Sequence, residues 1–249
     1  MATGGLIAGI GLAAVWAGGA WFTALVAGIV AVLVWELVRM LGGSPARAMA
    51  LGAAGGAAMV AAKLTPLTVA PALGALVIAL GMLALPAHRR IYAVMAGFVL
   101  VSAFGLILHR DDFGLTWMLW LVVLVAVTDT CGYFAGRLIG GPKFWPAVSP
   151  KKTWSGTVAG WIGAALVGWA FMAATETGVE LIVVSVLLSL ASQMGDIAES
   201  AIKRRMGVKD SSNLLPGHGG LFDRFDGLLG AALVLVVVKW LAGFPPPVA

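Results

Sequence analysis

Long, uninterrupted apolar runs are the feature that most constrains how this chain can fold. They extend over about 17–22 residues, the length that an α-helix needs to cross a bilayer. The mean hydropathy is +1.00, and 61% of the residues are hydrophobic, more than a soluble domain of this size could bury. A membrane β-barrel would instead show apolar and polar residues alternating along strands of about 10 residues. The sequence therefore predicts an all-α, polytopic integral membrane protein.

Nine apolar runs predict about nine transmembrane helices, of which the first and third are the least regular. The predicted helices cover residues 6–16, 20–40, 47–62, 67–86, 91–108, 115–139, 154–175, 179–203 and 226–243. The first run is short, but the first five residues carry no Lys or Arg and no clean cleavage site follows, so we expect a first helix rather than a signal peptide. Glycines spaced four residues apart, Gly52 with Gly56 and Gly156 with Gly160, predict close helix contacts.

The positive charges between the runs predict the orientation of the helices, because cytoplasmic loops retain Lys and Arg. With nine helices and a cytoplasmic N-terminus, Lys63, Arg110 and Lys239 fall outside. Thirteen basic residues then fall inside: Arg39, Arg47, Arg89, Arg90, Arg137, Lys143, Lys151, Lys152, Lys203, Arg204, Arg205, Lys209 and Arg224. Such basic loops suit anionic headgroups and nucleotides, although a simple electrostatic lipid anchor would also explain them.

The segment from Gln193 to Asp226 combines acidic and basic residues at a density unusual for so apolar a chain. It holds five of the 11 acidic and five of the 16 basic residues. Four of its polar residues recur at helical spacing and predict one polar face directed at a protein-lined cavity: Gln193, Asp196, Ser200 and Lys203. A Gly- and Pro-containing loop follows, and Asp223 and Asp226 then open the last apolar run, where acids suit the positive end of a helix dipole.

These residues resemble the signature of the phosphatidate cytidylyltransferases, also called CDP-diacylglycerol synthases. The motifs that carry the resemblance are Ser200-x-x-Lys203-Arg204, Lys209-Asp210, Leu215-Pro216-Gly217-His218-Gly219-Gly220 and Asp223-Arg224-x-Asp226. Two upstream patches agree: Asp129-x-x-x-Tyr133-x-x-Gly136-Arg137 and Ser149-Pro150-Lys151-Lys152-Thr153-x-x-Gly156. The resemblance covers residues 129–226 and is only architectural before them.

The intramembrane acids are the candidate metal ligands. Asp129 lies roughly 15 Å and Asp196 roughly 10 Å from the inner helix ends at 1.5 Å per residue, depths at which a carboxylate needs a partner. Ion pairs of Asp196 with Lys203, or of Asp129 with Arg137, are the structural alternative. Converging carboxylates with few His and Cys residues favour a hard ion such as Mg²⁺. The resemblance assigns the metal to Asp223 and Asp196, with Asp226 and Asp129 as further candidates; Asp226 could instead serve the helix terminus.

The basic residues are candidate phosphate ligands, since phosphoryl transfer needs charge more than covalent chemistry from the protein. We expect catalytic roles for Lys209 and Arg224 beside Asp196 and Asp223. The predicted substrate-binding residues are Arg137, Lys151, Lys152, Ser200, Lys203, Arg204, His218, Gly219 and Gly220. The alternative for Lys151 and Lys152 is snorkelling at the membrane edge, with Thr153 as a helix N-cap. For His218 the alternative is a turn with an incidental imidazole.

The resemblance implies that CTP and phosphatidate react to give CDP-diacylglycerol and pyrophosphate. A phosphomonoester, whose second pKa is about 6, is already ionised at neutral pH, so the attack requires no general base. We expect a single membrane domain, with N-terminal helices in 1–110 and catalytic helices and cytoplasmic loops in 111–249. The expected location is a bacterial inner membrane with the active site on the cytoplasmic side. Nucleic acid is not an expected partner, and a homodimer remains an open alternative. A related CTP-dependent lipid synthase or kinase and an ion-coupled transporter are the competing functions.

Overall fold

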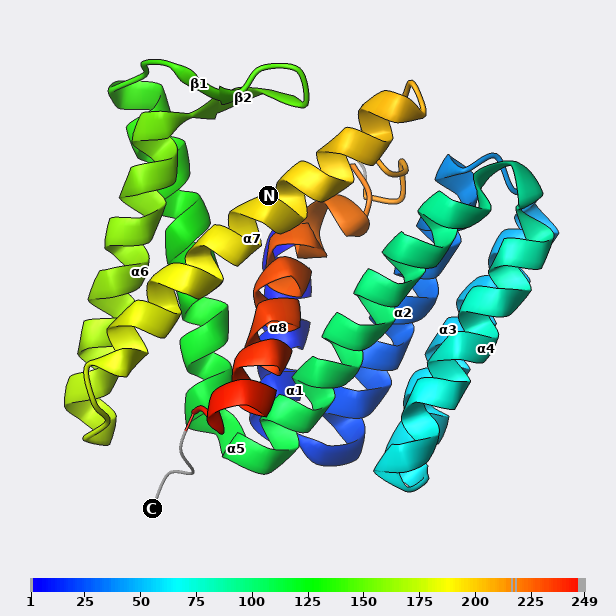
Figure 1. Cartoon of the computed structure of the whole chain (residues 1–249), viewed down its shortest axis with the longest axis horizontal. Helices are drawn as coiled ribbons and strands as arrows, with labels where there is room; N and C mark the ends of the chain where they lie inside the picture. The colour runs from blue at the N-terminus through cyan, green and yellow to red at the C-terminus, as the bar shows by residue number, and fades with distance from the viewer. Residues whose placement is uncertain (1, 216, 218, 246–249) are drawn as a thin grey trace. The chain divides into compact units, whose positions relative to one another are not determined.

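The computed structural model describes residues 2–215, 217 and 219–245, with side chains described from residue 9 onward. Almost all of the regular structure is helical (Figure 1). The chain divides into two compact units. The first unit comprises Met1–Asp111 with Met206–Arg224, and the second comprises Asp112–Arg205 with Phe225–Ala249.

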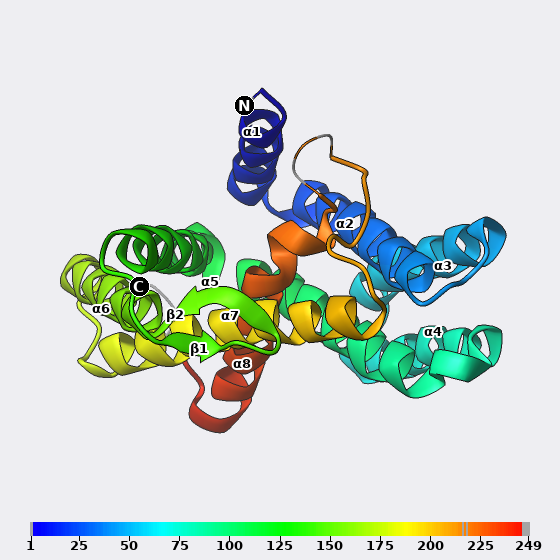
Figure 2. The same cartoon turned by 90° about the horizontal axis from the view of Figure 1, so that it is seen from above.

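The first unit contains the N-terminal helices. They are α1 (Ala2–Ala17), α2 (Gly19–Met40), α3 (Pro45–Leu64), α4 (Ala70–Ala84) and the first part of α5 (Arg89–Leu138), with short 3-10 turns η1 (Leu67–Val69) and η2 (Pro86–His88). Helices α2 and α3 lie side by side (Figures 1 and 2). Fully buried apolar residues of α2, among them Val30, Leu33 and Leu37, form the core of this unit.

The glycine pair of α3 allows this close packing. A Cβ atom on Gly52 would lie 2.5 Å from the carbonyl oxygen of Ala31, and one on Gly56 would lie 2.9 Å from that of Ala27. Both distances are too short for a side chain, so only glycine lets the backbones of α2 and α3 approach so closely. The four-residue glycine spacing in the sequence had predicted this contact.

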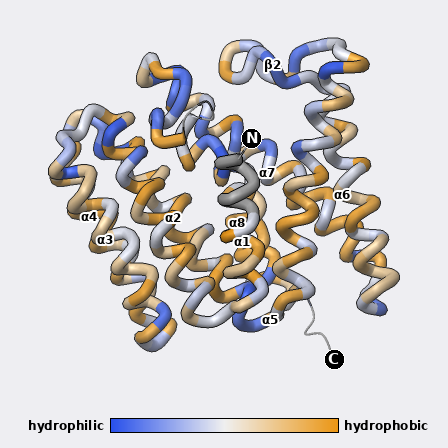
Figure 3. Tube along the Cα trace, turned by 180° about the vertical axis from the view of Figure 1, so that it is seen from behind, coloured by the Kyte–Doolittle hydropathy of each residue, from blue (hydrophilic) through white to orange (hydrophobic). Residues whose placement is uncertain are grey.

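The second unit contains the later helices and the only strands in the described residues. It holds the rest of α5, α6 (Trp154–Thr175), α7 (Glu180–Arg205) and most of α8 (Phe222–Ala242), with strands β1 (Lys143–Trp145) and β2 (Ser149–Thr153). The two strands pair antiparallel in a hairpin that the sequence had not predicted. Hydrophilic residues gather on this hairpin, whereas α6 is mostly hydrophobic (Figure 3).

The junction of β2 and α6 is set by a helix cap and by a glycine contact. The hydroxyl of Thr153, the N-cap of α6, accepts a hydrogen bond of 3.2 Å from the amide of Gly156, the cap that had been considered as the alternative role of this motif. A Cβ atom on Gly156 would lie 2.5 Å from the carbonyl oxygen of Gly132, so the backbones of α6 and α5 approach each other directly at this position. The hairpin is thereby fixed beside the C-terminal part of α5.

All nine predicted apolar runs are helical over most of their length, but nine separate spans are not confirmed. In the described part of the chain, six helical segments are long and apolar enough to cross a membrane: Gly19–Met40, Leu67–Ala84, Pro86–Leu138, Trp154–Thr175, Glu180–Arg205 and Phe222–Ala242. Helix α1 has only 16 residues, and α3 is rich in Ala and Gly. The 50-residue helix α5 merges two predicted runs across Gly114, whose φ of 80° is not helical. The orientation across the membrane remains a prediction.

Candidate active site

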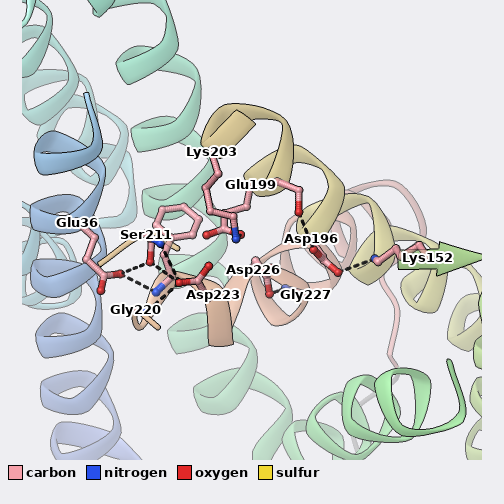
Figure 4. Close-up of polar contacts among 12 residues, drawn as sticks. Glu36, Lys152, Asp196, Glu199, Lys203, Ser211, Gly220, Asp223, Asp226 and Gly227 are labelled. Carbon is pink, nitrogen blue, oxygen red and sulfur yellow. Dashed lines mark hydrogen bonds and ion pairs between the residues drawn. The ribbon is translucent and has the colours of Figure 1, made fainter. Parts of the chain in front are cut away.

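In the first unit, a hydrogen-bonded segment holds the carboxylate of Asp223. This residue lies on the first turn of α8, and its Oδ2 atom accepts three hydrogen bonds. The donors are the amide and hydroxyl of Ser211, at 2.9 and 2.8 Å, and the amide of Gly220, at 2.8 Å (Figure 4). Three donors on one oxygen fix the plane of the carboxylate and therefore the position of Oδ1.

Glu36 of α2 holds the same segment from the other side. Its side chain is fully buried and accepts hydrogen bonds from the amides of Leu221 and Phe222, at 2.8 and 2.7 Å, and from the Ser212 hydroxyl, at 2.5 Å. The hydroxyl of Ser211 lies 3.3 Å from the second Glu36 oxygen. The two amides belong to the start of α8, where helix N–H groups lack partners within the helix.

The glycines of the predicted substrate loop leave no room for side chains. A Cβ atom on Gly220 would lie 2.0 Å from the hydroxyl of Ser211 and 2.5 Å from Glu36 Oε1. Gly219 has a φ of +79°, and a Cβ atom there would lie 3.0 Å from Asp223 Oδ2. These glycines therefore let the loop close around two carboxylates. His218, predicted to bind substrate, lies outside the described residues, as does Pro216.

In the second unit, a cavity of about 510 Å³ joins the two upstream motifs to α7. Helix α5, strand β2, helix α6 and helix α7 all contribute to its wall: Thr128, Asp129, Gly132, Tyr133, Gly136, Arg137, Lys151, Lys152, Thr153, Gly156, Thr157, Gln193 and Asp196. Its volume is typical of small-molecule sites. Every named residue of the two upstream motifs except Ser149 and Pro150 lies on this wall.

The cavity combines cationic and anionic side chains, as a site for a metal-bound anion would. Lys152 is paired with Asp196 at 2.7 Å and also donates to the carbonyl oxygen of Gln193 at 3.2 Å. Arg137 donates to the hydroxyl of Tyr133, four residues earlier on α5, at 2.8 Å. Lys151 is exposed at the cavity wall. Three cations on one wall suit phosphate oxygens.

Three carboxylates converge beside the cavity, on α7 and α8. Oxygen atoms of Asp196, Glu199 and Asp226 lie within 4.8 Å of one another (Figure 4). A Cβ atom on Gly195 would lie 2.3 Å from the carbonyl oxygen of Asp226, so a glycine contact brings α7 and α8 together here. Glu199, only 1% exposed, forms an ion pair with Lys203.

The geometry of this acidic cluster suits a hard divalent cation. Opposite oxygens around an octahedral Mg²⁺ lie about 4.2 Å apart, because each bond is 2.0–2.1 Å long. The oxygens of the cluster, which lie within 4.8 Å of one another, are at spacings close to that distance. The hydroxyl of Ser200 donates to Asp196 at 3.2 Å, and the amide of Gly227 donates to Asp226 at 2.7 Å. These hydrogen bonds orient two of the carboxylates, and the ion pair with Lys203 orients Glu199.

The structure brings most of the predicted residues into two groups. Asp129, Arg137, Lys151, Lys152 and Asp196 share the cavity, and Asp196 shares the acidic cluster with Asp226. Asp223, Gly219 and Gly220 form the hydrogen-bonded segment of the first unit. Three further predicted residues, Arg204, Lys209 and Arg224, have exposed side chains. A metal shared by Asp223 and Asp196 remains a prediction.

Several residues of these groups had received no functional role from the sequence, among them Glu36, Glu199 and Thr128. Glu36 could have been identified from the sequence, because it is the only acidic residue before Asp111 and interrupts an apolar run. Glu199 could also have been identified, because it lies three residues after Asp196 and four before Lys203, spacings that place side chains on one helical face. Thr128 could not have been identified in this way, since a threonine in an apolar helix is common.

Comparison with known proteins agrees with the motifs. The model of the cytidylyltransferase family matches residues 1–242. The phosphatidate cytidylyltransferase of Brucella suis biovar 1 (strain 1330) is 49% identical over 145 residues, covering 56% of this chain and 52% of the relative. The protein of the same name from Bacillus subtilis (strain 168) is 37% identical over 145 residues, covering 53% and 54%. That from Staphylococcus saprophyticus is 42% identical over 119 residues, covering 47% and 46%. The matched part spans about half the length of these curated relatives.

Proposed function

This chain belongs to the cytidylyltransferase family, and we propose that it is a CTP:phosphatidate cytidylyltransferase that makes CDP-diacylglycerol and pyrophosphate. The names of its relatives support this substrate pair. The observation that carries the proposal is the cavity of about 510 Å³, whose wall combines Arg137, Lys151 and Lys152 with Asp129 and Asp196. Cations for two anionic substrates and carboxylates for a cation are what the transfer of a nucleotidyl group requires.

The reaction is an in-line displacement at the α-phosphorus of CTP. A phosphate oxygen of phosphatidate forms the new bond to that phosphorus, and the bond to the β-phosphate oxygen breaks, so that the electron pair leaves with pyrophosphate. The nucleophile, with a second pKa of about 6, is already ionised at neutral pH. The chain therefore needs to bind, orient and screen two anions rather than to supply a general base.

The cationic side chains of the cavity would perform this work. Lys151 and Arg137, both exposed at the wall, are placed to bind phosphate oxygens of the substrates. Lys152, held between Asp196 and the Gln193 carbonyl, would supply a fixed positive charge deeper in the site. Fixed cations stabilise the charge that develops on the leaving pyrophosphate without reorganising during the reaction.

The acidic cluster would hold the divalent cation. We propose Asp196, Glu199 and Asp226 as its ligands, on the distances among their oxygens, with Asp129 on the same cavity wall and Asp223 as a further ligand that the family motif implies. When bound, Mg²⁺ would screen the repulsion between the two substrates and neutralise charge on the triphosphate. Ser200 and the amide of Gly227 would keep the carboxylates oriented.

We further propose that the active site faces the cytoplasm of a bacterial cell and that the chain lies in the inner membrane. The excess of Lys and Arg in the loops predicted to be inside supports this orientation. CTP would then reach the cavity from the cytosol, and phosphatidate would enter from the lipid phase. The acyl chains would remain among the exposed apolar side chains of the helices, such as Ile162 and Leu166 of α6.

The deciding experiment incubates the purified, full-length protein with cytidine-labelled CTP and phosphatidate, with and without Mg²⁺. We expect the label to move into the lipid extract only when both substrates and Mg²⁺ are present. A matched reaction with diacylglycerol in place of phosphatidate should give no labelled lipid. Labelled lipid formed from another lipid phosphate but not from phosphatidate would instead identify a related synthase, and no lipid product with any acceptor would contradict the proposal.

A further inference from the structure

Glu36 is the most unusual charged residue outside the proposed substrate cavity. It is the only acidic residue before Asp111, and its side chain is fully buried within α2. A buried carboxylate is retained only where hydrogen bonds or opposite charges compensate for the water it has lost. Its bonding partners therefore indicate why it is there.

Those partners come from both ends of one segment, Ser211–Phe222. At the start of the segment, the Ser212 hydroxyl donates to Glu36 at 2.5 Å. At the end, the amides of Leu221 and Phe222 donate at 2.8 and 2.7 Å (Figure 4). Glu36 therefore ties together two short stretches that are separated along the chain by the glycine-rich loop.

The same two stretches supply three donors to Asp223. Ser211, the neighbour of Ser212, donates its amide and hydroxyl, and Gly220, the neighbour of Leu221, donates its amide. The Ser211 hydroxyl has a single proton, and its 2.8 Å contact with Asp223 is shorter than its 3.3 Å contact with Glu36. Ser211 therefore donates its hydroxyl proton to Asp223, whereas Ser212, Leu221 and Phe222 donate to Glu36.

We propose that Glu36 is a positioning residue for the reaction: it holds both ends of Ser211–Phe222 so that the Asp223 carboxylate is presented in one orientation. The inference rests on the proposed function, in which Asp223 is a further ligand of the divalent cation. It gives α2, which lies outside the family motifs, a defined part in catalysis. Without Glu36 the donors to Asp223 would remain in the chain but would lose their fixed positions.

The test compares Glu36→Gln with Thr23→Val in the full-length protein. Glutamine keeps the size of the side chain, but its NH₂ group would face a backbone N–H of Leu221 or Phe222 and could not accept from it. Thr23 is a buried polar residue of the same helix whose hydroxyl donates to the Gly19 carbonyl within α2. Three quantities are measured for each variant: kcat and KM for CTP, the melting temperature, and amide hydrogen exchange in peptides covering 211–222.

We expect Glu36→Gln to lower kcat by about tenfold or more while KM changes by less than about twofold, the sign of an interaction that matters in the transition state. Exchange in 211–222 should become faster, and Thr23→Val should change neither quantity. An unchanged kcat and unchanged exchange would overturn the proposal, as would a loss of activity no greater than the loss of folded protein.

Ser212→Ala provides a second variant should Glu36→Gln fail to fold, because it removes one donor and leaves the carboxylate in place. A smaller fall in kcat with faster exchange in the segment supports the proposal, and wild-type values of both overturn it. Hydrogen exchange also separates this inference from the proposed function. A wild-type protein that makes no cytidine lipid would contradict the proposed function. The difference in hydrogen exchange between Glu36→Gln and wild type would still decide whether Glu36 holds the segment.

Discussion

At the level of single residues, charge decides what each carboxylate and lysine of the site contributes. Asp196 is central, because it lines the cavity, pairs with Lys152 and belongs to the acidic cluster. Asp196→Asn keeps its shape and removes its charge. Because Asp196 is a proposed metal ligand, loss of its charge should lower kcat at least about a thousandfold, at 1.36 kcal/mol per tenfold.

The measurement for Asp196→Asn is the rate of CDP-diacylglycerol formation against Mg²⁺ concentration. Asp112→Asn is the matched control, because Asp112 also pairs with a lysine, Lys239, but at an exposed position; its rate should stay close to wild type. An Asp196→Asn protein with the wild-type rate and metal dependence would show that Asp196 does not bind the metal.

Lys151 tests whether the cations of the cavity bind substrate. Its side chain is exposed at the cavity wall, so Lys151→Ala should raise the KM for CTP or phosphatidate and leave the melting temperature nearly unchanged. Lys143→Ala, on the facing strand β1 and absent from the cavity wall, should alter neither. Normal kinetics with a large fall in melting temperature would favour the snorkelling role for Lys151.

The buried pair of Glu199 and Lys203 should behave differently, because both side chains are largely removed from solvent. Glu199→Gln removes one counter-charge from a largely buried ammonium and should destabilise the fold by up to about 3–5 kcal/mol. The double variant Glu199→Gln with Lys203→Met should recover much of the melting temperature without recovering activity. If the single variant melts like wild type, the pair has no structural role.

At the level of elements, contacts through glycine hold neighbouring helices together within each unit. In Gly52→Ala the new Cβ atom would lie 2.5 Å from the Ala31 carbonyl oxygen, so α3 must move away from α2. Overpacking of this kind costs about 1–3 kcal/mol. We expect a lower melting temperature in detergent for Gly52→Ala.

Gly28→Ala on α2 is the control for that substitution, because a Cβ atom there would meet nothing within 4 Å. It should be neutral or stabilise the helix by up to about 1 kcal/mol. Equal melting temperatures for the two alanine variants would show that the α2–α3 contact relaxes at no cost.

At the level of the whole molecule, the testable property is orientation across the membrane. The exposed positions Ala147, in the β1–β2 turn, and Asn213, in the segment after α7, are predicted to be cytoplasmic, and Thr65, after α3, is predicted to be external. Single cysteines are introduced at these positions in a Cys131→Ser background, because Cys131 is the only cysteine. An impermeant thiol reagent should label only the Thr65 variant in intact cells and all three in opened vesicles. Labelling of the Ala147 and Asn213 variants in intact cells would show that the orientation is opposite to the predicted one.

The sequence by itself determined the local features of this protein. The apolar runs located the helices to within a few residues, and the Gly52–Gly56 spacing predicted a close helix contact. A cap at Thr153 could be named from the sequence, although only as an alternative. Each of these depends on residues a few positions apart, whose relation is set by the helical period of 3.6 residues. The motif residues likewise indicated the chemistry, because residue type alone determines charge.

Only the tertiary structure decided which of those residues meet. It joined motifs of α5, β2 and α7 around one cavity, paired Asp196 with Lys152, and showed a hairpin where a loop was expected. It also revealed Glu36, which contacts Ser212 across 176 positions in the chain. No periodic pattern encodes such a contact, because it arises from how packed helices place two distant backbones. The physical basis of the Glu36 contact is that a buried carboxylate needs hydrogen-bond donors, and these donors come from whichever segments the fold places beside it.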